Sequence, residues 1–215
     1  MKDVFEINNI LAVVIAYLIG SIPSAIWVSK WFFGIDVRDY GSKNAGATNT
    51  FRVIGKKAGF PVLFFDILKG WASVYFLSKF SVYPEASNQY INLQLAIGIA
   101  AVFGHVFPIY ERFKGGKGVA TLLGIVLAIN FPAAGVCFII FFITFLISKY
   151  VSLGAITAAV CFPLITVFVF KTQSISLIIF SIAISIMVVL THKKNIERLL
   201  KKQESKMPLN LRSKK

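Results

Sequence analysis

The chain has 215 residues, of which 57% are hydrophobic and 15% are charged, and its formal net charge is +14. Soluble domains have about 45–50% apolar and about 25% charged residues, so the composition excludes an ordinary soluble protein and favours a helical membrane protein. No run alternates with the two-residue period of a β-barrel strand. In a membrane protein, excess positive charge is typical of cytoplasmic loops near anionic lipid, and no soluble domain is left to bind nucleic acid.

Seven apolar runs predict seven transmembrane helices in an all-α membrane protein. The expected helices cover residues 7–33, 60–80, 90–110, 118–130, 132–148, 152–170 and 174–191. The fourth and fifth runs are short and meet at Asn130, where a single bent segment or a re-entrant pair is the alternative. We expect residues 1–200 to form one polytopic membrane domain and residues 201–215 to form a basic tail.

Basic residues are concentrated in alternate connections between these helices. Residues 30–57, 112–117, 149 and 193–215 contain 19 of the 23 Lys and Arg residues. The positive-inside rule therefore places these connections in the cytoplasm, with the N-terminus outside and the C-terminus inside.

Polar residues interrupt the first two predicted helices. The break around Pro23 can be a kink that a membrane helix tolerates, or it can turn Ser21 or Ser24 toward a site. Asp66 and Lys69 are three residues apart and share one helix face. Charged groups at membrane depth are costly, so this pair either marks a functional interior face or forms a local ion pair that holds the helix end.

The first glycine-rich run covers residues 36–59. Its glycines permit positive φ angles and close approach of a ligand, its amides and hydroxyls are donors, and its basic side chains suit phosphate. A loop of this composition can also be an ordinary connection whose charges enforce topology. The candidate phosphate-binding residues are Arg38, Ser42, Asn44, Gly46, Thr48 and Asn49.

The second glycine-rich run covers residues 113–121 and follows His105 at the end of the third predicted helix. Backbone N–H groups at a helix N-terminus favour an anion, and the lysines add charge. Gly118 stands where a Walker A motif needs Ser or Thr, so a nucleotide-binding P-loop is not expected, and a flexible basic hairpin is the alternative. The candidate residues are Lys114, Gly115, Gly116, Lys117 and Gly118. Both runs face the same side in the predicted topology, so they can converge on one anionic ligand.

A third candidate group follows the last predicted helix. If that helix continues, His192 and Asn195 share a face, as do Asn195 and Arg198. Histidine is the usual group for proton transfer near neutral pH, although a single histidine beside the membrane is more often an interfacial residue. The two cysteines lie in apolar runs, and no metal-ligand spacing is visible.

Together these segments resemble the bacterial acyl-phosphate:glycerol-3-phosphate acyltransferases. The family's motifs are matched by RDYGSKNAGATN (residues 38–49), by Gly104, His105, Pro108 and FKGGKGVAT (residues 113–121), by His192, Asn195, Ile196, Arg198 and Leu199, and by DILKG (66–70) and VSLG (151–154). Lys43 stands where the family usually has Gly, and Lys193 where it often has Arg.

The resemblance implies seven helices in a bacterial cytoplasmic membrane and a reaction that needs no metal or other cofactor. A fatty acyl group passes from acyl phosphate, not acyl-CoA, to the 1-hydroxyl of sn-glycerol 3-phosphate, which gives lysophosphatidic acid and phosphate. The expected partners are these two substrates and membrane lipids, without an obligatory protein partner or nucleic acid.

Both substrates carry phosphate, which fits two cationic glycine-rich runs on one side. We expect Arg38, Ser42, Asn44, Lys117 and Ser152 to hold the donor phosphate and Lys114, Gly115 and Gly116 to bind glycerol 3-phosphate. His192 and Asn195 orient or deprotonate the attacking hydroxyl, unless a phosphate oxygen is the base. Asp66, Lys69, His105 and Arg198 are expected in supporting positions.

Two other classes compete with an enzyme. A transporter of a phosphorylated metabolite would also need anion-binding loops, but the sequence has neither two related halves nor a midplane site built from broken helices. A membrane anchor that binds anionic lipid through its tail leaves the glycine-rich runs unexplained. The motifs therefore favour the enzyme.

Overall fold

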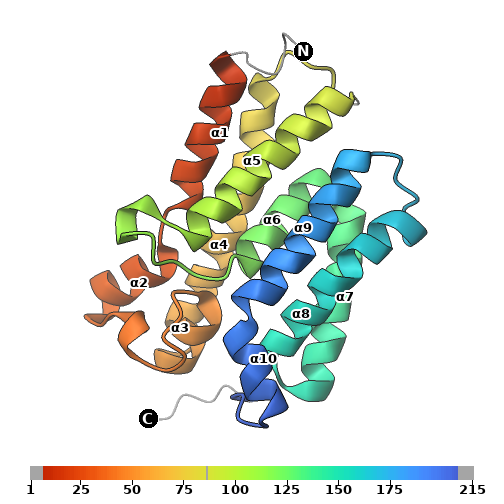
Figure 1. Cartoon of the computed structure of the whole chain (residues 1–215). Helices are drawn as coiled ribbons and strands as arrows, with labels where there is room; N and C mark the ends of the chain where they lie inside the picture. Colours follow the sequence, from red (N-terminus) through yellow and green to blue (C-terminus); the bar gives the residue numbers. More distant parts are fainter. Residues whose placement is uncertain (1–6, 86, 208–215) are drawn as a thin grey trace. The chain divides into compact units, whose positions relative to one another are not determined.

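A computed structural model describes residues 7–85 and 87–207, and every regular element in these residues is helical. The chain divides into two compact units, the first ending at Asn130 and the second beginning at Phe131. This boundary is the break that the sequence predicts between the fourth and fifth apolar runs. Figure 1 labels the α-helices of both units and colours them along the chain.

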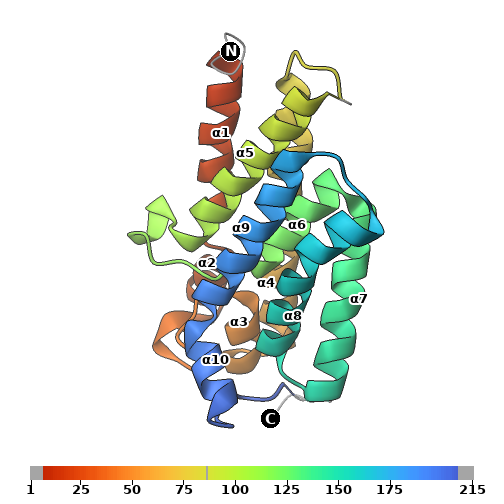
Figure 2. The same ribbon diagram turned by 45° about the vertical axis from the view of Figure 1, so that its right-hand side comes forward.

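The described residues of the first unit form six α-helices and three short 3-10 helices. The α-helices are α1 (Ile7–Gly20), α2 (Ser24–Phe33), α3 (Ala47–Val53), α4 (Lys56–Leu77), α5 (Asn88–Val106) and α6 (Val119–Ile129). The 3-10 helices are η2 (Val37–Asp39), η3 (Ser78–Phe80) and η4 (Ile109–Glu111). Helix α4 packs along α6, and α1 packs along α5 (Figures 1 and 2).

Small residues allow these two helix pairs to approach closely. A Cβ atom added to Gly70 of α4 would collide with the backbone of Thr121 in α6. A Cβ atom added to Gly104 of α5 would collide with the backbone of Tyr17 in α1. Close backbone approach at glycine is a common way to pack membrane helices, because lipid supplies no hydrophobic force between them.

The second unit contains α7 (Phe131–Ser148), α8 (Val151–Leu164), the π-helical turn η5 (Ile165–Val169), α9 (Ile175–Thr191) and α10 (Lys193–Leu200). Helix α8 packs against both α7 and α9. Pro163 lies near the end of α8, where a missing N–H donor is compatible with the change to a π turn. Helices α9 and α10 meet at a bend of 61°. The last helix therefore does not continue straight past His192.

Five helical segments in the described part of the chain are long and apolar enough to cross a membrane. They are Ile7–Phe33, Lys56–Phe80, Asn88–Glu111, Phe131–Ser148 and Val151–Val169. The bent pair α9 and α10 would make a sixth span. Helix α6 has only 11 residues, whereas a full span needs about 20. The prediction of an all-α membrane protein is confirmed, and seven helical segments occur at the predicted places. The predicted count of seven membrane spans is not confirmed.

Both glycine-rich runs lie at one end of the first unit. The first run connects α2 to α4 and contains α3, and the second connects α5 to α6. Because α5 returns toward the end where α4 begins, both connections are away from the turn between α4 and α5 (Figure 1). This placement within the first unit agrees with the prediction that the two runs face one side.

Candidate active site

The buried side chain of Asn49 holds the first glycine-rich run in shape. Asn49 Nδ2 donates to the carbonyl oxygens of Val37 at 2.8 Å and Tyr40 at 3.1 Å, while Oδ1 accepts from the Ser42 amide at 2.8 Å. The amide group of Asn49, a predicted phosphate ligand, is thus directed at the loop backbone. The half-buried residues Ser42, Asn44 and Thr48 lie along the loop that Asn49 supports.

Lys43 has the backbone conformation that glycine adopts most easily. Its φ angle is +59°, in the left-handed region, and its side chain is exposed. For a residue with a Cβ atom this conformation costs about 1–2 kcal/mol. The lysine therefore keeps the backbone of the loop in a glycine-like conformation and adds a positive charge beside Ser42 and Asn44.

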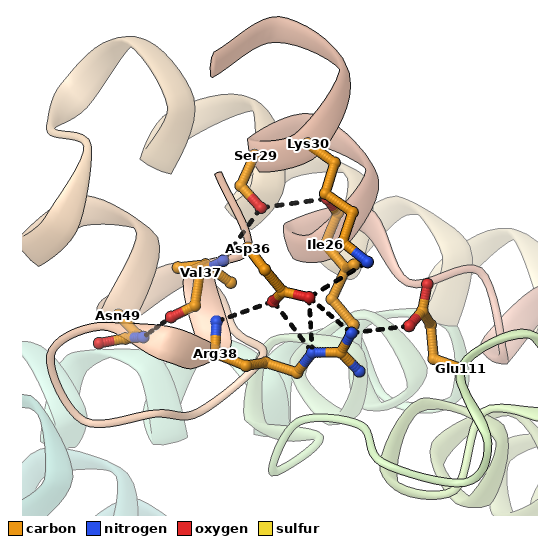
Figure 3. A network of polar contacts seen from close by, with 8 residues as sticks. All are labelled: Ile26, Ser29, Lys30, Asp36, Val37, Arg38, Asn49 and Glu111. Atoms are coloured by element: carbon orange, nitrogen blue, oxygen red, sulfur yellow. Dashed lines mark hydrogen bonds and ion pairs between the residues drawn. The ribbon is translucent and has the colours of Figure 1, made fainter. Parts of the chain in front are cut away.

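Arg38 lies between two carboxylates (Figure 3). Its Nε and Nη2 atoms donate to Asp36 at 3.0 Å and 2.7 Å, and Nη2 also lies 2.9 Å from Glu111 Oε2. Lys30 Nζ lies 3.1 Å from Asp36. The hydrogen bond from the Arg38 side chain lowers the pKa of Asp36 far below its usual value, and Asp36 in turn raises the pKa of Arg38. Asp36 and Arg38 therefore hold each other in the charged form at neutral pH.

The second glycine-rich run folds back on the end of α5. The Gly115 and Gly116 N–H groups donate to the carbonyl oxygens of Val106 and His105, each at 3.1 Å. These N–H groups, expected to bind glycerol 3-phosphate, are therefore used inside the protein. A Cβ atom on Gly116 would lie 2.7 Å from the carbonyl oxygen of Ala45 and would also collide with the His105 ring. Glycine is required there because two backbones meet.

The two glycine-rich runs therefore converge in the first unit, as predicted. They meet where Gly116 lies against Ala45, and just before the second run Glu111 of η4 forms an ion pair with Arg38 of the first run. The basic residues Lys43 and Lys114 belong to the same two runs. Gly118, with φ +79°, ends the second run and leads into α6.

A buried polar cluster supports this junction. Lys69 Nζ lies 2.8 Å from Asp66 Oδ1 and donates to the Ile22 carbonyl oxygen at 2.8 Å. Because Ile22 lies between α1 and α2, this hydrogen bond connects α4 to the segment where the first helix is interrupted. Ser24 Oγ donates to Asp66 Oδ1 at 2.6 Å, and His105 Nδ1 lies 3.5 Å from the same oxygen. Asp66 and Lys69 thus form an ion pair, which is one of the two alternatives that the sequence left open, and the cluster around it joins α2, α4 and α5.

A cavity of about 10 Å³ lies beside this cluster, and Ser21, Ser24, Lys69, His105 and Gly116 are among its lining residues. That volume corresponds to about one water molecule, so the cavity is too small for a substrate. Ser21 and Ser24 therefore face polar groups of the protein interior. The break around Pro23 thus positions two polar side chains in addition to bending the helix.

Three residues of the second unit converge on one carboxylate. Ser152 Oγ and Asn195 Nδ2 donate to Glu204 Oε1 at 2.9 Å and 2.7 Å, and Arg198 Nε donates to Oε2 at 2.7 Å. Burial raises the pKa of Glu204, but these hydrogen bonds outweigh it and the pKa is lowered. Glu204 was not among the residues predicted for the site. Its one signal in the sequence is that it is the single acidic residue of the basic tail 201–215, of which residues 208–215 lie outside the described part.

His192 is buried at the bend between α9 and α10, with 3% of its surface exposed. Its Nδ1 atom lies 2.8 Å from the carbonyl oxygen of Val188. A carbonyl oxygen only accepts, so Nδ1 carries the proton of the neutral ring and Nε2 carries the lone pair. Nε2 is therefore the nitrogen that can accept a proton. The backbone N–H of Asn195 donates to the backbone carbonyl oxygen of His192 at 2.8 Å, which keeps the two candidate residues close despite the bend.

The described residues bring no three His, Cys, Asp or Glu side chains together as a metal site would require. Cys137 and Cys161 are not joined in a disulfide. The polar groups gathered in each unit are those that bind anions and orient hydroxyls: guanidinium, ammonium, amide, hydroxyl and imidazole groups.

The chain is similar to known acyltransferases over most of its length. A family model for glycerol-3-phosphate acyltransferase matches residues 10–202. A glycerol-3-phosphate acyltransferase of Fusobacterium nucleatum is 44% identical over 90% of this chain and 95% of its own. One of Staphylococcus haemolyticus is 43% identical over 92% of this chain and 97% of its own.

Two crystal structures of PlsY (YgiH), an integral membrane glycerol 3-phosphate acyltransferase, are similar in fold. The glycerol 3-phosphate form has a TM-score of 0.83 and 36% identity over 93% of this chain and 96% of that chain. The lysophosphatidic acid form has a TM-score of 0.81 and 35% identity over 94% and 97%. The chain therefore belongs to the glycerol-3-phosphate acyltransferase family and is an integral membrane acyltransferase.

Proposed function

We propose that the chain transfers a fatty acyl group from acyl phosphate to the 1-hydroxyl of sn-glycerol 3-phosphate. The hydroxyl oxygen attacks the acyl carbonyl carbon, the bond from that carbon to the phosphate oxygen breaks, and the hydroxyl loses its proton. The products are lysophosphatidic acid and inorganic phosphate. Apart from family membership, the observation that carries this proposal is the convergence of the two glycine-rich runs, since both substrates present a phosphate group.

Acyl phosphate is already activated, so the protein needs to orient the hydroxyl, stabilise the leaving phosphate and keep water away. In the first unit, Arg38, Ser42, Asn44 and Lys117 are proposed to hold the donor phosphate. Lys114 is proposed to bind glycerol 3-phosphate through its ammonium group. Gly115 and Gly116 set the path of the backbone, because their N–H groups bond to α5.

The second unit supplies the other proposed groups. Ser152 is proposed to move its one hydroxyl proton from Glu204 to the donor phosphate when that substrate binds. Asn195 is proposed to orient the attacking hydroxyl through its side-chain amide. The Nδ1–H···O hydrogen bond to Val188 fixes the tautomer in which His192 Nε2 accepts the proton. If a phosphate oxygen is the base instead, His192 acts through orientation alone.

We further propose that residues 1–200 form the membrane domain with seven helical segments, the N-terminus outside and the C-terminus in the cytoplasm. The distribution of Lys and Arg supports this orientation, and the placement of both glycine-rich runs at one end of the first unit agrees with it. The proposed active site then faces the cytoplasm from the bacterial cytoplasmic membrane, and no protein partner is needed.

The decisive experiment supplies purified protein in detergent or lipidic mesophase with glycerol 3-phosphate and either palmitoyl phosphate or palmitoyl-CoA. Released phosphate and lysophosphatidic acid are measured with a metal chelator present. We expect equal amounts of both products from palmitoyl phosphate and none from palmitoyl-CoA. Turnover with palmitoyl-CoA alone would overturn the proposed donor, and no turnover with either, in protein shown to be folded, would overturn the proposed reaction.

A further inference from the structure

We propose that Glu111 is a built-in competitor for a substrate phosphate at Arg38, so that it weakens phosphate binding without taking part in the acyl transfer. This inference rests on the proposed function, because it takes the ligand to be a phosphate group. The observation behind it is that the Arg38 guanidinium bridges two carboxylates: Asp36, in the first glycine-rich run, and Glu111, in η4 just before the second run (Figure 3).

The two carboxylates are not held equally. Asp36 accepts from the Arg38 side chain at Nε and Nη2 and from the Arg38 backbone amide at 3.0 Å, and it pairs with Lys30. Glu111 makes a single ion pair with Arg38, at 2.9 Å, and both side chains are partly open to solvent, with exposed fractions of 16% and 24%. The contact with Glu111 is therefore the one that an incoming anion can replace at lower cost.

The charges favour such an exchange. Lys30 and Arg38 carry two positive charges, and Asp36 and Glu111 carry two negative ones, so the group is neutral as it stands. A phosphate monoester carries about −1.5 to −2 charges at pH 7, and its oxygens can accept two parallel hydrogen bonds from a guanidinium. A phosphate that replaces Glu111 can therefore bring more negative charge to Arg38 than a carboxylate does. It can also form two hydrogen bonds to the guanidinium, whereas Glu111 makes one contact.

The backbone after Glu111 is also held in an unfavourable form. Arg112 and Phe113 have φ angles of +53° and +61°, in the left-handed region, and both carry large side chains. Such conformations persist where surrounding contacts enforce them, and they cluster at ligand clamps and switch segments. The N–H groups of Phe113 and Lys114 donate to the carbonyl oxygens of Pro108 and Glu111, and the two left-handed residues lead directly to Lys114 in the second glycine-rich run. Glu111 therefore lies at the start of a constrained turn that ends at a proposed phosphate-binding lysine.

The first test is the substitution Glu111→Gln, which keeps the size of the side chain and removes its charge. We expect the KM for glycerol 3-phosphate, for acyl phosphate or for both to fall about three- to tenfold, which corresponds to the strength of one partly exposed ion pair, while kcat changes less than about twofold. Measurement of both KM values identifies which phosphate competes. If neither KM falls, or if either rises while the other is unchanged, the proposal is wrong.

A matched control is Glu85→Gln, which removes the same charge from an exposed residue in the turn between α4 and α5. This turn lies at the other end of the first unit, so neither KM should change. An equal fall in KM for Glu85→Gln would show that net charge alone is responsible, and it would overturn the role of Glu111.

The second test asks whether Glu111 acts through Arg38. Binding of glycerol 3-phosphate and of inorganic phosphate is measured by calorimetry for the wild type, Glu111→Gln, Arg38→Gln and the double variant, with thermal unfolding as the check on folding. We expect Glu111→Gln to strengthen binding about three- to tenfold when Arg38 is present and to have no effect when it is absent. Equal gains in both backgrounds would overturn the proposal.

This binding assay needs no turnover, so it separates the two hypotheses. A wild-type protein that binds phosphate but does not use acyl phosphate would contradict the proposed donor. The binding constants of the four variants would still decide whether Glu111 competes with phosphate at Arg38. A protein that turns over acyl phosphate with unchanged KM after Glu111→Gln would contradict the competition alone.

Discussion

The carboxylate of Glu204 accepts a hydrogen bond from Asn195 Nδ2 at 2.7 Å. Asn195 is in α10, and Glu204 lies in the tail that follows this last helix. The same carboxylate binds Ser152 and Arg198, so one tail residue fixes three candidate site residues of the second unit. The segment continues to Met207, whose amide donates to the Lys149 carbonyl oxygen at 2.9 Å. The beginning of the tail is therefore part of the packed second unit.

The substitution Glu204→Gln tests this arrangement. Gln keeps the oxygen that Ser152 and Asn195 contact but removes the charge that Arg198 needs, so we expect a lower unfolding temperature and lower kcat. Glu197→Gln, on an exposed face of α10, is the matched control and should change neither. A Glu204→Gln protein with wild-type unfolding temperature and activity would show that the carboxylate does not organise these residues.

Glu204 also gives a prediction for acid stability. Its folded pKa is lowered from the usual value of 4.5, so it contributes stability that is present above that value and is lost as the pH falls through the lower folded pKa. We expect the wild type to lose more stability than Glu204→Gln as the pH falls below the usual glutamate pKa, measured by thermal unfolding in detergent. Parallel pH profiles for the two proteins would contradict this linkage.

The buried pair Asp66 and Lys69 should be essential as a pair. Lys69→Met leaves the Asp66 carboxylate in a buried site without its cation and removes the hydrogen bond to the Ile22 carbonyl oxygen. Removal of one partner of a buried ion pair costs about 3–5 kcal/mol, so we expect strong destabilisation. The double variant Asp66→Leu with Lys69→Met has no isolated charge and should unfold at a higher temperature than Lys69→Met. The opposite order would show that the charges interact little.

The helices and the convergence of the two glycine-rich runs could be predicted from sequence because each rests on local pattern. Apolar runs gave the helical segments, Pro132 and Asn130 marked the break, and a spacing of three residues placed Asp66 beside Lys69. The distribution of Lys and Arg then put both runs on one side, and the first unit confirms that they meet.

Other features depended on contacts that local pattern does not encode. Ser152 and Glu204 are 52 residues apart, and nothing in a basic tail indicates which side chain will fold back. The glycines of the second run were expected to offer N–H groups to an anion, but those groups bond to α5 and the glycines serve close packing. The bend at His192 was not predicted either, because the sequence there is compatible with a continuous helix.

Close packing at Gly116 can be tested by a pair of substitutions to alanine. In Gly116→Ala the new methyl group would meet the Ala45 carbonyl oxygen and the His105 ring, so the two glycine-rich runs must separate. We expect a lower unfolding temperature and a large loss of activity. Gly135→Ala in α7 meets no atom within 4 Å, and alanine is favoured over glycine inside a helix, so activity should be retained and stability should be unchanged or higher. Similar behaviour of the two variants would contradict the packing explanation.

His192 is the residue whose chemistry the structure defines most closely, because the hydrogen bond to Val188 leaves Nε2 as the basic nitrogen. If Nε2 accepts the proton of the attacking hydroxyl, His192→Ala should lower kcat by about 10²- to 10⁴-fold, with a smaller change in KM. His192→Gln restores a polar side chain without a titrating group, so it separates the two roles. Recovery of most of the activity by Gln would assign His192 to orientation and leave the proton to a phosphate oxygen. Full activity of His192→Ala would remove the histidine from both roles.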